Sequence, residues 1–299
     1  MPLDQGRTRK TLWLLNGVFL FIGALAAFYP MDATLLLFLL PAFYCIQQLA
    51  LPGWPTAVIA IAPLALAFVE PRFISGISIY GLTVICGMLM CAAYVRRRLR
   101  LALVLPTALL ILASLAGLLS SVGFHLQALP KAIEGFARAM IDGFIALSPP
   151  EQHAELTQGR YELEARLTGF FPALLVMAYS LYAWLNLVLV NSFRCELNLK
   201  AYKASDWLLL PFIAGGLGAL IPGGRLIGLN VLLIVLNVYF FQGMAIAASY
   251  MDGRHWPRFI KWLVYILLVI QLYIGVAVLG LFDTWFDFRK KIGNSEGEE

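Results

Sequence analysis

The feature that most constrains this chain is a series of long apolar runs that recurs from one end of the sequence to the other. A helix needs about 20 consecutive apolar residues to cross the hydrocarbon core of a bilayer. Charged residues make up only 13% of the chain, against roughly 25% in soluble domains. The sequence therefore predicts an all-α, polytopic transmembrane helix bundle of eight to nine spans. The expected spans are residues 11–29, 33–51, 54–69, 73–95, 101–123, 168–191, 207–222, 226–250 and 262–283.

Basic residues between the runs predict the orientation of this bundle. The basic stretch "RTRK" (7–10) precedes the first run, and a second basic cluster, Arg96, Arg97, Arg98 and Arg100, follows four runs later. Short cytoplasmic loops carry an excess of Lys and Arg, so we expect both clusters, and with them the N-terminus, on the cytoplasmic side. The four arginines are expected to set orientation and to contact anionic lipid. We assign the net charge of +5 to the membrane and expect no nucleic-acid partner.

The C-terminal half leaves two span counts open. "RHWPRFIK" (254–261) and "RKK" (289–291) are both basic, and a single apolar run separates them. With nine spans, the two clusters would lie on opposite sides of the membrane. With eight, residues 207–222 would not cross: this run is short, holds three glycines, and suits a re-entrant segment that protein buries. Eight spans with a cytoplasmic C-terminus and nine spans are both carried forward.

Residues 124–166 form the one long polar excursion, which the predicted topology places outside. Apolar residues recur there at helical spacing: Ile133, Phe136, Met140, Phe144 and Leu147. Glu134, Arg138 and Asp142 fall on the opposite face, four residues apart, where they can form ion pairs. This pattern predicts an external amphipathic helix. Three roles are open for it: lying in the membrane interface, covering a cavity as a lid, or binding a partner.

The sequence offers little to a catalytic mechanism. Its three histidines, His125, His153 and His255, lie far apart, and motifs of metalloproteases, phosphate loops and nucleophile elbows are missing. The spans hold almost no ionisable group, whereas membrane proteases and ion pumps usually show one. We therefore expect no enzyme activity, no catalytic residue, no cofactor and no metal site.

Neutral polar residues within the spans are the candidate ligand-binding groups. Asn230 and Asn237 are seven residues apart and share a helix face, and Gln242 lies on another face of the same helix. Tyr182 and Asn186 share a face in an earlier span. In lipid such groups find partners inside the bundle. Two interpretations are open: hydrogen bonds between helices, worth about 0.6 kcal/mol each, or a neutral polar pocket for a small molecule.

Several segments in order carry a family resemblance over roughly residues 165–291. They are "LTGFFPALLVMAYSLYAWLNLVLVNSF", "DWLLLPF", "FFQGMAI" and the closing "GLFDTWFDFRKK". This order resembles the YybS-like family of predicted bacterial integral membrane proteins, whose function is unknown. The most specific residues, expected as a family signature or interface, are Gly243, Gly280, Asp283, Trp285, Asp287 and Arg289.

The family is distantly similar to the substrate-binding components of energy-coupling-factor transporters, which bind a small molecule and dock on a shared ATPase module. The resemblance implies a multi-pass protein of the bacterial cytoplasmic (inner) membrane that binds or transports a small, neutral or weakly polar molecule. Its partners would be the lipid bilayer and an ATPase module. The alternative is a non-transporting scaffold or assembly factor that holds a cytoplasmic partner.

Five segments are expected along the chain: a cytoplasmic N-terminus (1–10), a five-span bundle (11–123), the external excursion (124–166), a C-terminal membrane bundle (167–291) and a flexible tail (292–299).

Overall fold

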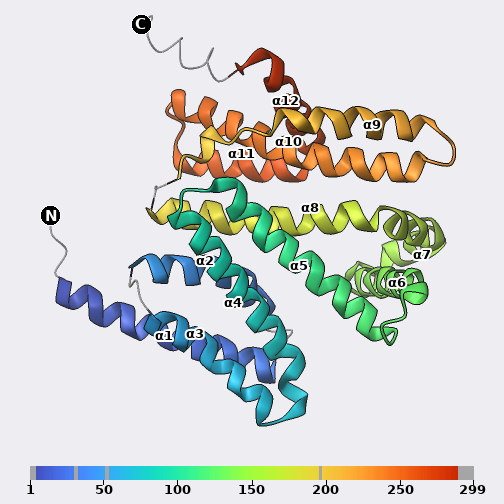
Figure 1. Cartoon of the computed structure of the whole chain (residues 1–299). Helices are drawn as coiled ribbons and strands as arrows, with labels where there is room; N and C mark the ends of the chain where they lie inside the picture. The colour runs from blue at the N-terminus through green and yellow to red at the C-terminus, as the bar shows by residue number, and fades with distance from the viewer. Residues whose placement is uncertain (1–4, 30–32, 51–53, 195–196, 289–299) are drawn as a thin grey trace, which may run out of the picture. The chain divides into compact units, whose positions relative to one another are not determined.

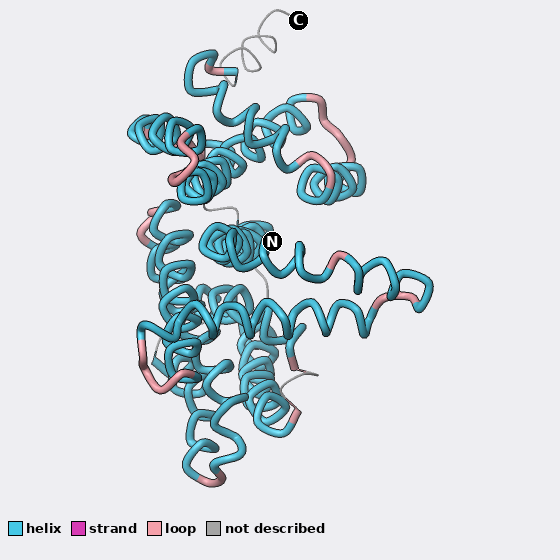
Figure 2. Tube along the Cα trace, turned by 90° about the vertical axis from the view of Figure 1, so that its right-hand side faces the viewer, coloured by secondary structure: helices cyan, strands magenta, loops and turns pink. Residues whose placement is uncertain are grey.

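The computed structural model describes residues 5–29, 33–50, 54–194 and 197–288 of this chain. Within these ranges all regular secondary structure is helical, and short loops join the helices (Figure 2). The predicted all-α fold is therefore confirmed. The expected tail (292–299) and Arg289 lie outside the described residues, as do residues 1–4 at the other end.

The chain divides into two compact units, one of residues 1–114 with 178–197 and one of residues 115–177 with 198–299. Two helices, α5 (Leu99–Ser121) and α8 (Arg160–Arg194), contribute residues to both units. The other helices of the first unit are α1 (Gln5–Phe28), α2 (Thr34–Ala50), α3 (Trp54–Ile61), η1 (Ala62–Phe68), η2 (Pro71–Phe73) and α4 (Ile74–Val95).

Aromatic side chains fill the centre of the first unit, where α2 packs against α4. Phe19 of α1 packs against Tyr44 of α2, with ring centroids 6.0 Å apart. Tyr80 of α4 is fully buried and donates a hydrogen bond of 2.7 Å to the carbonyl oxygen of Ala60. These aromatic contacts fix four segments of the unit against one another.

The second unit holds the predicted excursion and the C-terminal helices. Its helices are η3 (Leu126–Ala128), α6 (Leu129–Leu147), α7 (Pro150–Gln158), η4 (Leu199–Ala201), η5 (Asp206–Leu208), α9 (Leu209–Leu220), α10 (Arg225–Gly253), α11 (Arg258–Ile270) and α12 (Tyr273–Phe286). α10 is the central element, and α9 runs alongside it (Figure 1).

Glycines let α10 approach two neighbours at backbone distance. A Cβ at Gly228 would lie 2.3 Å from the backbone nitrogen of Ala219 on α9. On the other side, a Cβ at Gly243 would lie 2.0 Å from the carbonyl oxygen of Val276 on α12, and one at Gly280 would lie 1.9 Å from the carbonyl oxygen of Tyr239. Small residues allow such close packing between membrane helices, where van der Waals contact is the main attraction.

Helix length bears on the predicted spans. Among the described residues, four helical stretches are long and apolar enough to cross a membrane: Pro71–Val95, Leu99–Ser121, Arg160–Phe193 and Arg225–Gly253. The pair Phe259–Ile270 and Tyr273–Phe286 would add a fifth but is bent by 96°. The remaining expected spans are shorter apolar helices: Asn16–Phe28, Thr34–Ala50, Thr56–Phe68 and Asp206–Leu220. These lengths do not confirm the predicted count of eight to nine.

Candidate functional site

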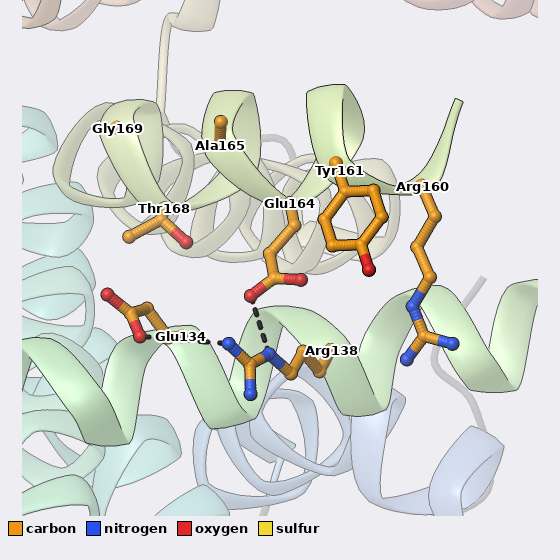
Figure 3. Close-up of a pocket in the computed structure, with 8 residues that line it drawn as sticks. All are labelled: Glu134, Arg138, Arg160, Tyr161, Glu164, Ala165, Thr168 and Gly169. Carbon is orange, nitrogen blue, oxygen red and sulfur yellow. Dashed lines mark hydrogen bonds and ion pairs between the residues drawn. The ribbon is translucent and has the colours of Figure 1, made fainter. Parts of the chain in front are cut away.

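A cavity of about 790 Å³ lies between α6 and the first turns of α8, within the second unit (Figure 3). Glu134 and Arg138 reach into it from α6, and Tyr161, Glu164 and Thr168 point toward them from α8. The lining residues of α8 are Arg160, Tyr161, Glu164, Ala165, Thr168 and Gly169. Arg160, Glu164 and Thr168 are spaced four apart, which puts them on one helix face.

Ion pairs join the two walls of the cavity. The Arg138 Nε donates to Glu164 Oε1 at 2.5 Å, and a guanidinium nitrogen of Arg138 lies 3.9 Å from Glu134. Arg160 pairs with Asp142 of α6 at 2.9 Å. The hydrogen bond and charge of Glu164, helped by Glu134, raise the pKa of Arg138 above its ordinary value. The polar face predicted for the excursion is therefore the face that meets α8.

The lining of the cavity presents polar atoms as well as charges. The Thr168 hydroxyl oxygen is buried and has no hydrogen-bond partner among the described residues. Gly169, one residue on, has its carbonyl oxygen held by the Nδ2 of Asn230 at 2.9 Å. Thr168 is thus a group that a ligand can satisfy, and Asn230 supports the wall beside it.

The apolar face of α6 is largely exposed, and at one position it also contacts α8, where Phe136 packs on Phe171 with ring centroids 5.9 Å apart. Four of its predicted residues are exposed: Phe136, Met140, Phe144 and Leu147. Ala137 and Ile141, between the two faces, are buried. α6 is therefore amphipathic, as predicted, with its charges toward the cavity and an exposed apolar face that suits a lipid surface.

The side chain of Asn230 makes hydrogen bonds with backbone groups of α8. Its Oδ1 accepts from the N–H of Ala173 at 3.1 Å, and its Nδ2 donates to the carbonyls of Gly169 and, in its own helix, Leu226. In an uninterrupted helix the N–H of Ala173 would pair with the carbonyl of Gly169. Pro172 lies between them, and a helix-interior proline opens this ladder. We call this arrangement an amide clamp.

Asn186 makes a second amide clamp, in the first unit. Its Oδ1 accepts from the N–H of Ala42 at 3.0 Å, and its Nδ2 donates to the carbonyls of Phe38 and Tyr182. Pro41 lies between Phe38 and Ala42 within α2, just as Pro172 lies between the clamped residues of α8. Two of the predicted ligand residues therefore repair proline-broken helices.

Of the other three predicted ligand residues, Asn237 and Gln242 are buried and Tyr182 is half-buried. Asn237 Oδ1 accepts from the hydroxyl of Tyr273 at 2.6 Å. Gln242 accepts from the N–H of Ala204 at 2.9 Å and donates to Asp283 Oδ2 at 2.8 Å. Tyr182 packs on Phe38, and its hydroxyl has no hydrogen-bond partner among the described residues. None of the five candidates lines the cavity, and ligand binding by them stays a prediction.

Three of the predicted signature residues, Gly243, Gly280 and Asp283, lie where α12 meets α10. Gly243 and Gly280 form the close crossing. Asp283, only 3% exposed, accepts from Gln242 and from the N–H of Phe288 at 2.8 Å, which ties down the end of α12. Asp287 follows that end with a left-handed φ of 45°, and Trp285 is exposed.

The match to known families covers this packing core. A family model described as "Predicted membrane protein (DUF2232)" matches residues 17–284. The chain belongs to this family. No curated protein and no solved structure matches the chain.

Membership of this family confirms the predicted resemblance and extends it, because the match includes the N-terminal helices as well as residues 165–284. It does not show the further similarity to energy-coupling-factor components. Trp285, Asp287 and Arg289 lie beyond the matched residues. The side chains of the basic cluster are all exposed: Arg96, Arg97 and Arg98 lie between α4 and α5, and Arg100 lies in the first turn of α5.

Sequence reasoning missed part of the cavity. It named Glu134 and Arg138 as one polar face, but it did not predict Arg160, Tyr161 or Thr168. The spacing of Arg160, Glu164 and Thr168 was the available signal, since a polar face on α8 opposite a polar face on α6 predicts that the two meet. Among the described residues, no group of three His, Cys, Asp or Glu side chains could hold a metal ion.

Proposed function

We propose that this chain is a non-enzymatic membrane protein that binds a small neutral or zwitterionic solute in the cavity between α6 and α8, as a binding or transport component. The cavity itself is the observation that carries the proposal. Its volume of about 790 Å³ falls within the range of roughly 300–1,000 Å³ that is usual for ligand pockets.

The charges of the cavity favour a solute without net charge. Two positive side chains, Arg138 and Arg160, face two negative ones, Glu134 and Glu164. A solute with a strong net charge would meet repulsion from one pair, whereas a zwitterion or a polar neutral molecule can use both. The unpartnered hydroxyl of Thr168 supplies a further hydrogen-bonding position.

Ion pairs at the other end of the second unit support a topology that puts the cavity outside. Lys200, before α9, and Lys261, in α11, both pair with Asp252 at the end of α10. A direct ion pair cannot reach across a hydrocarbon core of about 30 Å. Lys200 and Asp252 therefore lie on one side, and an even number of crossings separates them. Because α10 crosses, α9 crosses too, which argues against a re-entrant segment at residues 207–222.

The bend between α11 and α12 then accommodates the remaining basic cluster. A pair bent by 96° can enter and leave the membrane on the same side, so residues 254–261 and 289–291 need not be opposed. We propose eight crossings, with both termini on the cytoplasmic side of an inner membrane. A cysteine introduced at Gly293 is then shielded from an impermeant thiol reagent in intact cells, and labelling there would refute this topology.

A ligand screen tests the solute site. Purified full-length protein is heated in detergent with a panel of neutral and zwitterionic solutes, and a stabilising solute is expected. Arg138→Gln should abolish the stabilisation. Arg166→Gln is the matched control, because Arg166 also pairs with a glutamate at 2.5 Å on α8 but does not line the cavity. A panel without effect, together with native mass spectra that contain only lipid, would count against solute binding.

The energising partner is part of the same proposal. A substrate-binding component of a transporter needs a module that supplies energy, and the predicted candidate is an ATPase module. Affinity purification from native membranes should recover it. Recovery of cell-envelope or ribosome-linked proteins instead would favour the scaffold that the sequence left as the alternative.

A further inference from the structure

A second cavity, of about 700 Å³, lies at the turn between α5 and α6. It shares no lining residue with the cavity between α6 and α8. Its lining side chains come from one stretch of the second unit: Phe124, His125, Leu126, Gln127, Ala128 and Lys131. Phe124 and Leu126 are large, apolar and exposed, three others are polar, and none of the six carries a negative charge.

The backbone of this turn brings Phe124 to the cavity in an unusual conformation. The N–H of Phe124 donates to the carbonyl of Leu119 at 2.8 Å, and that of Gly123 donates to Ser120 at 3.1 Å, which is the Schellman end of a helix. Gly123 is left-handed there, and so is Phe124, with a φ of 61°. This conformation is strained for a bulky side chain, and such strain clusters at ligand-binding positions. It leaves the Phe124 ring 71% exposed.

The polar side chains of the cavity offer donors without a counter-charge. No hydrogen bond or ion pair engages the ammonium group of Lys131 among the residues that the structure describes. Glu134, one turn along α6, pairs with Arg138 and lines the other cavity. The imidazole of His125 lies against the turn, because a Cβ at Gly123 would be 3.8 Å from its Nε2. These donors favour an anion with several oxygen atoms as the ligand.

The position of the cavity after α5 sets its depth in the membrane. α5 is one of the four stretches that are long and apolar enough to cross. Its 23 residues span about 35 Å at 1.5 Å each, against a hydrocarbon core of about 30 Å. Phe124 follows soon after Ser121, the last residue of α5, and α6 then presents its exposed apolar face, which suits the membrane interface. The cavity therefore lies at the level of the lipid headgroups.

We propose that this cavity binds the headgroup of an anionic phospholipid, with its phosphate at Lys131 and the first carbons of its acyl chains against Phe124 and Leu126. Charge complementarity favours an anionic over a zwitterionic lipid, because none of the lining residues is a carboxylate that could pair with a lipid ammonium group. The depth of the cavity and its two exposed apolar side chains favour a lipid over a free phosphate ion. The site requires that α5 crosses the membrane and does not depend on solute binding between α6 and α8.

Photo-cross-linking of the purified full-length protein in detergent micelles tests this site. The probe is phosphatidylglycerol with a diazirine at the start of an acyl chain, used well below saturation, where labelling is proportional to affinity. Peptide mapping should place the label on residues 122–131, and the matching phosphatidylcholine probe should label this stretch less. Equal labelling of the stretch by the two lipids would overturn the proposal.

Substitutions of Lys131 separate a specific headgroup contact from a general effect of surface charge. Lys131→Gln should lower phosphatidylglycerol labelling of residues 122–131 about fivefold and leave phosphatidylcholine labelling unchanged, and Lys131→Arg should keep the wild-type labelling. Arg225→Gln is the matched control, because Arg225 is also an exposed cation in the first turn of a helix but does not line the cavity. Equal losses in Lys131→Gln and Arg225→Gln would contradict the proposal.

Two further arms test the apolar contact and the nature of the anion. Phe124→Gly removes the ring, and glycine adopts a left-handed φ without strain, so thermal stability should not fall while labelling by both lipids does. Unchanged labelling in this variant would rule the ring out of the site and count against the proposal. Glycerol phosphate, which lacks acyl chains, should not compete with the phosphatidylglycerol probe at equal concentration, and competition there would assign the cavity to a free anion instead.

Discussion

Replacing Gly280 by alanine is expected to destabilise the second unit by about 3–4 kcal/mol. A Cβ at this position would lie 1.9 Å from the carbonyl oxygen of Tyr239 and 2.7 Å from the backbone nitrogen of Gly243. Real Cβ atoms essentially never come closer than 3.0 Å to such atoms. The obstacle is backbone and not a flexible side chain, so α12 has to move away from α10 until the gap has widened from 1.9 Å to at least 3.0 Å.

That displacement acts on the whole crossing. A gap of about 1 Å forfeits a quarter to a half of the dispersion attraction across it, and overpacking a tight contact costs about 1–3 kcal/mol. The hydrogen bond of 2.8 Å from Gln242 to Asp283 lies at the same crossing and lengthens with it, at a cost of about 0.6 kcal/mol. Because backbone opposes backbone, we take the upper end of the packing cost, and with the lengthened hydrogen bond the total is about 3–4 kcal/mol.

Denaturant unfolding of the purified protein in detergent, followed by tryptophan fluorescence, measures this cost. Gly275→Ala is the matched control on the same helix, because a Cβ there has nothing within 4 Å. It should be neutral or should stabilise by up to about 1 kcal/mol, since alanine favours a helix. If the two variants unfold at the same denaturant concentration, α10 and α12 do not meet backbone to backbone and the reasoning fails.

Three other predictions test the clamps, the cavity and the end of α12. Asn230→Ala removes three hydrogen bonds and should lower the free energy of unfolding by about 1–2 kcal/mol. In a double-mutant cycle, the same substitution should lower it by less in a Pro172→Ala background, because α8 can then form its own backbone hydrogen bonds. The raised pKa of Arg138 keeps its ion pair throughout the alkaline range, because a base with a raised pKa loses its contribution only above that pKa. Arg138→Lys should therefore match the wild type in thermal stability up to about pH 10 and fall below it as the pH rises above about 10.4, the ordinary pKa of lysine; parallel profiles would refute this. Asp283→Asn should leave one of its two donors without an acceptor, and hydrogen exchange should rise at the end of α12 but not in α6.

The helical architecture was largely predictable because apolar runs and their polar breaks are local signals. The boundaries of the helices were less predictable from the sequence. α8 begins at Arg160 and not near 168, because "RYELEARL" is polar but is rich in good helix formers. The bend between α11 and α12 falls at Gln271 and Leu272, where the sequence has neither proline nor glycine. Next to the bend, Tyr273 donates a hydrogen bond to Asn237 and stacks on Phe240. Both partners lie far away in the sequence, so residue spacing cannot reveal these contacts.

The candidate site, too, was predictable from the sequence only in part. The charged face of α6 follows from its periodicity, and so does its amphipathic form. The partner of that face does not, because it lies on another helix. The grouping of Asn230 with Asn237 on one face of α10 was sound, yet the two reach different neighbours, α8 and α12. Periodicity gives the direction of a side chain along its own helix, and only packing decides what it meets.

The amide clamps also set an order of events during synthesis. The N–H of Ala42 is 144 residues away from the asparagine that accepts from it, and that of Ala173 is 57 residues away from its own. At about 5–20 residues per second, α2 waits roughly 7–29 s for Asn186, and α8 waits roughly 3–11 s for Asn230. During that interval each proline-broken helix has no clamp partner within the nascent chain. A ribosome stalled before residue 186 should therefore leave α2 open to proteases or to rescue by an insertion chaperone, and elongation past that residue should end the vulnerability abruptly.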